Sequence, residues 1–373
     1  MAISRLVRLA LVSLVTCSSV ARGSLQKPLD VSTCLASSIF PDPPKGSQAL
    51  HTPAGSNGLW EVRMTADKGR GLFAVVDITR GTRLLTENPL VTVKPPPIVP
   101  GRGFQLSAML APVEEAFHSL TPKQQEEYLS CHEVRFGDEG RDEDAAAAMA
   151  KTKSKTTTVS GGRLLRILRS NAYNMQDGRV GLYPNVALIN HDCRPNVLNT
   201  DLKGSVYKVE GLQRVIVATR DIQAGEEIVT TYVPLLADTE TRRTRLNQYG
   251  FVCNCASCRS SRDDEERVQM KQILDDVTAV AKQASKVGAK EHAARAAVLA
   301  QYIRDNGFAD YGAQTSQLAA ELSVRAGDLK TAATWAAIHV EVVQLANAEG
   351  AESDEVRQAR ALLRKIKRKL TKK

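Results

Sequence analysis

The chain has 373 residues, which is enough for two or three domains, and its 43% hydrophobic and 24% charged residues are ordinary for a soluble globular protein. No segment reaches the roughly 20 apolar residues that a membrane helix needs, so the composition excludes a protein built on membrane spans. The net charge of +9 is concentrated in residues 364–369 with Lys372 and Lys373. Because no aromatic residues interleave this run, it gives no strong nucleic-acid signal, and a solvated helix end explains it more simply than a nuclear address.

The first 23 residues predict a secretory signal peptide. Arg5 and Arg8 precede a short apolar run at residues 9–15, and cleavage is expected after Ala21 or Gly23. The expected location is therefore the secretory pathway or the extracellular space. An organelle-targeting peptide or a misassigned start codon would explain the segment too, and the location would then be the nucleus or the cytoplasm.

Residues 24–58 are rich in Pro, Ser and Gly and predict an extended lead-in. Short apolar segments then predict strands at 59–64, 71–76, 82–85 and 90–93. Strands at such close spacing argue against a Rossmann fold, which needs helices between its strands.

A proline-rich segment at 94–103 ends this unit, and a mostly helical insert of about residues 104–172 follows. It predicts helices at 105–120, at 122–131 (begun by Thr121 and Pro122) and at 162–172, with a low-complexity insertion at 137–162. Strands are expected at 197–199, 206–209, 215–219 and 227–232. From residue 263 onward apolar residues recur at helical spacing and predict an array of helices; they are Val268, Ile273, Leu274, Val277, Val280, Ala294, Ala297, Leu299, Ile303, Ala332, Trp335, Ala336 and His339.

Three of the seven cysteines form a Cys-x-Cys-x-x-Cys motif at Cys253, Cys255 and Cys258. A tetrahedral zinc site needs a fourth ligand, and Cys193 supplies a thiol next to the Asn190-His191 pair. Disulfide pairing among these four thiols is the competing interpretation. Cys17 would leave with the signal peptide, and Cys34 and Cys131 are either a disulfide or two lone thiols.

Three further motifs are weak when each is taken alone. Lys68-Gly69-Arg70-Gly71 is a tight turn, Asn190-His191 is a polar pair, and Gly225 begins a Gly-Glu-Glu-x-x-x-x-Tyr segment that ends at Tyr232. In this order, and followed by the cysteine motif, they resemble the SET-domain protein lysine methyltransferases over residues 59–258. Gly181-Leu182-Tyr183-Pro184 is most similar to the SET-and-MYND subgroup and its fungal relatives, although no cysteines for a MYND finger lie between Val93 and Gln105.

The resemblance implies an α+β fold: a SET β-fold of short strands with a helical insert at 59–232, a post-SET zinc segment at 233–262, and an all-α helical region at 263–373. It implies methyl transfer from S-adenosylmethionine to a lysine of a histone or another protein. A SET-fold interaction module without turnover, and a secreted zinc-structured protein without cofactor, are the alternatives. The substrate protein and the degree of methylation do not follow from the sequence.

The resemblance also assigns residues to roles. Tyr232 is expected to be catalytic, to position the amine and to contact the cofactor. Tyr183 and Tyr249 are expected to line the lysine channel. The remaining cofactor contacts are Lys68, Gly69, Arg70, Gly71, Asn171, Asn190, His191 and Phe251, and the structural zinc ligands are Cys193, Cys253, Cys255 and Cys258.

Overall fold

A computed structural model describes residues 49–51, 57–97, 106–137, 159–175, 177–202, 213–283, 285–347 and 353–372. The chain divides into two units, Met1–Gly46 and Ser47–Lys373, and all described residues belong to the second. The predicted signal peptide, Cys17, Cys34, nearly all of the lead-in and the strand expected at 206–209 lie outside the described residues.

One five-stranded sheet carries most of the motifs, in the strand order β1-β2-β3-β11-β8. Neighbouring strands are antiparallel except β11 and β8, which run parallel with Val229 opposite Asn190 and Thr230 opposite His191. The strands are β1 (Ala49–His51), β2 (Trp60–Met64), β3 (Arg70–Ala74), β11 (Glu227–Thr230) and β8 (Asn190–His191).

Two three-stranded sheets complete the β part, in the orders β4-β10-β9 and β5-β7-β6. Trp60, Leu72, Ile216 and Ile228 share one buried core beneath these strands. The predicted close succession of short strands is confirmed. β1, which lies in the predicted lead-in, and β6, β7 and β8 were not predicted, because two or three residues are too few to show alternation. The strands are β4 (Arg83–Glu87), β10 (Gln213–Ala218), β9 (Val197–Leu202), β5 (Val91–Val93), β7 (Val180–Leu182) and β6 (Ala172–Asn174).

The helices of the insert pack together around Phe117, Tyr128 and Ile167. The predicted cap at Thr121 is confirmed: its side chain accepts from the backbone N–H of Gln124, whose side chain accepts from the backbone N–H of Thr121. The elements are α2 (Leu110–His118), preceded by the 3₁₀ turn η2 (Leu106–Met109), α3 (Pro122–Ser130) and α5 (Gly161–Asn171).

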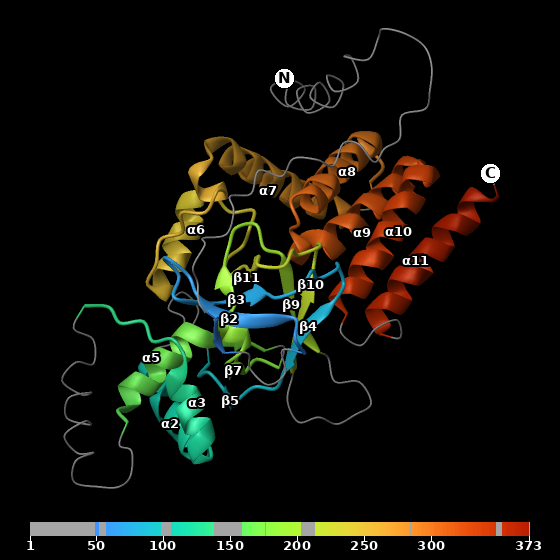
Figure 1. The fold of residues 1–373 in the computed structure, drawn as a ribbon. Helices are drawn as coiled ribbons and strands as arrows, with labels where there is room; N and C mark the ends of the chain where they lie inside the picture. The colour runs from blue at the N-terminus through green and yellow to red at the C-terminus, as the bar shows by residue number, and fades with distance from the viewer. Residues whose placement is uncertain are drawn as a thin grey trace, which may run out of the picture. The chain divides into compact units, whose positions relative to one another are not determined.

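The C-terminal part is helical, as predicted, and its helices pack on one another in chain order (Figure 1). Leu274, Leu299 and Trp335 are buried in one core, and this core also contains Cys193 and Cys258. Val268 is exposed instead, because Arg267 and Met270 lie on the buried face of its helix. Ala294 is exposed because Ala293 and Ala296 form the buried face of the next helix. The helices are α6 (Thr239–Leu246), α7 (Ser261–Ala281), α8 (Ala289–Asp305), α9 (Ala309–Ala326), α10 (Leu329–Ala346) and α11 (Asp354–Leu370). In the described part of the chain, no helix has the length and apolarity to cross a membrane.

Candidate functional site

The Asn190-His191 pair is held by the parallel pairing of β8 with β11, and the segment after it is fastened to β11 a second time. The backbone N–H of Asp192 donates to the Thr230 carbonyl at 2.9 Å. Asn196, which is fully buried, accepts from the Val229 N–H at 2.8 Å and donates to the Glu227 carbonyl at 2.8 Å through its side chain. Both ends of the motif are therefore fixed to one strand.

The glycine turn, residues 68–71, contacts Asn190 beside the paired strands β8 and β11. The Asn190 Nδ2 donates to the Arg70 carbonyl at 3.1 Å and to Glu227 Oε1 at 2.8 Å. A Cβ at Gly71 would lie 2.7 Å from Asn190 Nδ2 and 2.9 Å from Glu227 Oε1, so any larger residue would displace the Asn190 amide and the Glu227 carboxylate. Gly69 has a φ of +73°, the left-handed conformation that glycine adopts without strain.

Lys68 contacts the same carboxylate, with its Nζ 3.0 Å from Glu227 Oε2. Burial acts to lower the pKa of Lys68, but the charge and the hydrogen bond of Glu227 outweigh it, so the pKa is raised. The structure thus brings Lys68, Gly71 and Asn190 together around Glu227, which the sequence analysis had assigned no role.

His191 is buried and links the paired strands β8 and β11 to the thiols. Its Nδ1 accepts from the backbone N–H of Tyr232 at 3.1 Å, which places its proton on Nε2, 3.4 Å from the Cys193 Sγ. Burial lowers the pKa of His191 to about 4, so the ring is neutral near pH 7.

Tyr232 lies just after β11 and belongs to an aromatic cluster. Its ring centre is 5.0 Å from that of Tyr249 and 5.5 Å from that of His191, which lies 6.2 Å from Phe251. The Tyr232 hydroxyl donates to the Ile189 carbonyl at 2.7 Å, and burial raises its pKa well above the ordinary value. The phenol is therefore neutral, and its oxygen retains lone pairs that can accept.

Tyr183, predicted to line the substrate channel, is fully buried in the core of the sheets. Its ring is 6.2 Å from that of Tyr173, and the Arg214 guanidinium stacks on both rings, at 4.9 Å from Tyr173 and 5.7 Å from Tyr183. Tyr173, to which the sequence analysis gave no role, reaches Tyr183 and Arg214 because β6 pairs with β7.

Asn171 ends α5 and is buried, and its Nδ2 donates to the His132 carbonyl at 2.6 Å and to the Ile167 carbonyl at 2.7 Å. The Arg70 guanidinium donates to the Ser130 carbonyl at 2.5 Å. Residues 130–132 thus connect Asn171 to the glycine turn. The hydrogen bonds of Asn171 do not reach Asn190 or His191, two of the other predicted cofactor contacts.

The four predicted zinc ligands come together. The Sγ atoms of Cys193, Cys253, Cys255 and Cys258 lie within 4.8 Å of one another, and those of Cys193 and Cys258 are 3.6 Å apart. All four are free thiols, so no disulfide joins them. Sulfurs bound to zinc at about 2.3 Å lie about 3.8 Å apart in a tetrahedron, so the cluster fits the ion. Hydrogen bonds from Cys193 and the other two thiols, and then from Arg242, lower the pKa of Cys258 and favour the thiolate that zinc binds.

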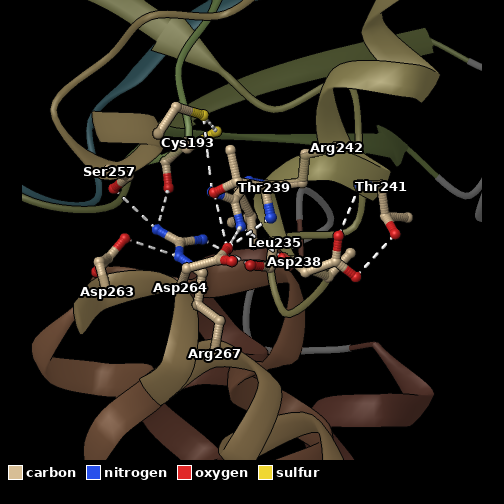
Figure 2. Close-up of polar contacts among 12 residues, drawn as sticks. Cys193, Leu235, Asp238, Thr239, Thr241, Arg242, Ser257, Asp263, Asp264 and Arg267 are labelled. Atoms are coloured by element: carbon tan, nitrogen blue, oxygen red, sulfur yellow. Dashed lines mark hydrogen bonds and ion pairs between the residues drawn. The ribbon is translucent and has the colours of Figure 1, made fainter. Parts of the chain in front are cut away.

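Arg267 of α7 is fully buried and holds the backbone around these thiols (Figure 2). It donates to the carbonyls of Cys193 at 3.0 Å and Leu235 at 2.6 Å, and to the Ser257 hydroxyl at 3.0 Å. Asp263, one turn earlier on α7, balances its charge at 2.9 Å. The signal in the sequence was an arginine on the apolar stripe of a predicted helix.

Arg242 of α6 is the second fully buried arginine in this network (Figure 2). Its Nη2 lies 3.6 Å from the Cys258 Sγ and donates to the Thr239 hydroxyl at 2.9 Å, and its Nη1 donates to the Ala237 carbonyl at 2.5 Å. Asp264 of α7 lies 3.6 Å away and also accepts from the Thr239 N–H at 2.5 Å. The two arginines tie the thiol cluster to α6 and α7.

Comparison with known proteins adds to this geometry. Residues 69–233 match the family model described as the SET domain. The chain is similar to N-lysine methyltransferase SMYD2-B of Xenopus laevis, with 35% identity over 111 residues, which are 28% of this chain and 24% of that protein. It is also similar to histone-lysine N-methyltransferase set5 of Schizosaccharomyces pombe, with 29% identity over 201 residues, 54% of this chain and 50% of that protein.

These matches span 24% to 50% of the relatives' own length. Among solved structures, the SET domain of LSMT bound to lysine and AdoHcy aligns over 84% of this chain and 85% of that chain, with a TM-score of 0.34 and 13% identity. That likeness is too distant to bear on the site.

Proposed function

This chain carries a SET domain, and on that premise we propose that it transfers a methyl group from S-adenosylmethionine to a lysine side chain of a protein. The observation that carries the proposal is the position of Tyr232. Its hydroxyl donates a hydrogen bond to the carbonyl of Ile189, the residue before β8. Its ring packs on Tyr249, next to the thiol-bearing segment. The similar proteins named as lysine methyltransferases support the same chemistry.

Cys193, Cys253, Cys255 and Cys258 would hold a zinc ion. Four thiolates close its coordination shell and leave no open position for substrate, so the ion would be structural. Its effect would be to fix residues 249–258, and with them Tyr249 and Phe251, against His191. Metal binding and the shape of the aromatic cluster would then be coupled.

The aromatic cluster of His191, Tyr232, Tyr249 and Phe251 fits a sulfonium cofactor, because aromatic faces stabilise a cation. Glu227, Lys68 and Asn190 would bind the polar groups at its other end. When bound, the cofactor supplies an electrophilic methyl group. The chain's residues have to bind the lysine, keep its amine neutral and align it.

A neutral amine is required because a protonated lysine has no lone pair, and free lysine has a pKa of roughly 10.4. Neutral His191 and the buried phenol of Tyr232 place no negative charge beside the amine, so burial favours loss of its proton to water before transfer. The Tyr232 proton is engaged by Ile189, so the phenol oxygen acts as an acceptor that orients the amine hydrogens. Alignment in a water-poor pocket would supply most of the rate.

The substitution Tyr232→Phe tests this role. It removes the hydroxyl and keeps the ring, so methyl transfer should fall by about 10²–10³-fold while cofactor affinity stays within a few-fold. Transfer is measured with labelled S-adenosylmethionine and a peptide library, and affinity by calorimetry. Tyr302→Phe is the matched control, because it deletes a hydroxyl that has no hydrogen-bond partner in the described structure, on α8.

Undiminished transfer by Tyr232→Phe would refute the assigned role. Cofactor binding without transfer to any library member or to histones would instead favour a SET-fold interaction module. A zinc-loaded chain that binds no S-adenosylmethionine would overturn both.

A further inference from the structure

The last helix concentrates the positive charge of the chain. Residues 354–373 contain nine Lys and Arg and two acidic residues, a net charge of +7 out of the chain's +9. Val356, Ala359 and Ile366 are the buried side of α11, which packs on α10. The opposite side carries the basic face of α11, which we define as Arg364, Lys365, Arg368, Lys369 and Lys372, all exposed.

These five cations form one continuous surface rather than a scattered tail. Together with Ala361 they line a single shallow hollow. Their spacing of i, i+4 and i+8 puts them on one side of the helix, over about 12 Å at a rise of about 1.5 Å per residue. The sequence alone suggested a solvated helix end, but the fold gathers the charges on one outward side.

No acidic side chain neutralises this face in the described part of the chain. Arg357 of α11 pairs with Asp354, near the other end of the helix. On α10, Glu341 pairs with Arg80. Like charges at i and i+4, as in Arg364 with Arg368 and Lys365 with Lys369, disfavour the helix. A polyanion bound along this side would relieve that repulsion.

We propose that the basic face of α11 binds the phosphate backbone of a double-stranded nucleic acid without reading its sequence. A row of phosphates complements a row of cations, and release of counterions from the duplex drives such binding. The face has no aromatic residue for stacking on unpaired bases, which favours duplex over single strand. DNA and RNA present the same phosphate chemistry.

An anionic membrane fits this helix less well. Helices that bind membranes bury their apolar side in the lipid, whereas the apolar side of α11 is already buried against the protein. The five cations would then contact lipid headgroups alone, without apolar insertion.

The test is binding of the full chain to labelled DNA and RNA duplexes of mixed sequence, followed by fluorescence anisotropy at several salt concentrations. Five phosphate contacts predict a slope of log K against log salt of about −4.5 for DNA, a loss on the order of 10²–10³-fold between about 50 and 200 mM salt. Arg364→Gln with Arg368→Gln should reduce the slope by about 1.8. The lysine versions, R364K with R368K, should restore it.

The matched control is Lys286→Gln with Lys290→Gln, which removes the same charge from two exposed positions, one just before α8 and one in its first turn, and should leave the slope unchanged. Methyl transfer to a short peptide should be the same in every variant.

Binding of only one duplex type identifies the nucleic acid. The proposal is overturned by failure to bind either duplex at low salt, by an equal loss in the control pair, or by binding to phosphatidylserine vesicles but not to duplexes.

Discussion

Single buried polar side chains determine the geometry of the candidate site. The side-chain oxygen and nitrogen of Asn196 both bond to the β11 backbone. His191 accepts from the Tyr232 N–H through Nδ1, and its Nε2 contacts the Cys193 Sγ. Buried groups of this kind stabilise the fold only while every partner is present. Substitutions at these positions should therefore lower the free energy of unfolding by more than the number of deleted atoms suggests.

Asn196→Ala tests this at the residue scale. It leaves the Val229 N–H and the Glu227 carbonyl buried without partners, so the free energy of unfolding should fall by about 2–4 kcal/mol. Urea unfolding of the zinc-loaded protein measures the change. Asn254→Ala, at an exposed position, should change stability by less than about 0.5 kcal/mol, and a similar value for Asn196→Ala would contradict the argument.

At the scale of elements, the sequence indicated the helices of the insert, those from residue 261 onward and the longer strands, because each carries a repeating apolar pattern or a cap. It did not indicate α6, which lies in the segment expected to bind zinc. It could not indicate β8, whose two residues are a strand only because β11 lies beside them. It also gave Arg267 no role, since an arginine on a helix is ordinarily solvated. Its burial follows from the carbonyls of Cys193 and Leu235 and the hydroxyl of Ser257, which three segments outside α7 present to it.

The packing of α9 on α10 makes a pH-dependent contribution. His339 is buried, and its Nδ1 lies 3.2 Å from the Ser316 hydroxyl. Burial lowers the pKa of His339, against the weaker raising effects of Ala313 and Glu321. As pH falls below about 6.5, the unfolded chain takes up a proton that the folded chain does not, so stability should decrease by up to about 1.4 kcal/mol per pH unit.

The free energy of unfolding in urea is measured between about pH 7.5 and 5.5, a range that brackets the ordinary histidine pKa. His339→Gln should show a shallower pH dependence, whereas His118→Gln, at an exposed position, should keep the wild-type dependence. Equal slopes for the His339 variant and the wild type would rule out His339 as the source.

At the scale of the whole molecule, the thiol cluster joins the SET domain to the C-terminal helices. Cys193 lies next to the Asn-His pair, and the other three thiols follow α6. Arg267 of α7 donates to the Cys193 carbonyl in one thiol segment and to the Ser257 hydroxyl in the other. A disturbance at the metal should therefore extend into α7.

Zinc removal tests this connection. Chelation should raise hydrogen exchange at residues 249–258 and in the first turns of α7, and it should abolish cofactor binding, because Tyr249 and Phe251 lose their anchor. Cys255→Ser should have the same effect as the chelator. Cys131→Ser, a cysteine outside the cluster, should keep one zinc per chain, and full zinc content in Cys255→Ser would refute the four-thiolate site.

The sequence by itself determined the SET domain, the helical C-terminal part and the four thiols, because these depend on residue types in a fixed order. The match at residues 69–233 confirms the first of these, and the clustered sulfurs agree with the last. Only the tertiary structure decided that Glu227 gathers Lys68 and Asn190, that Arg242 and Arg267 brace the thiols, and that Tyr183 lies in the core. Those relations join residues far apart in the chain, and a local pattern carries no information about which distant backbone groups will need a partner.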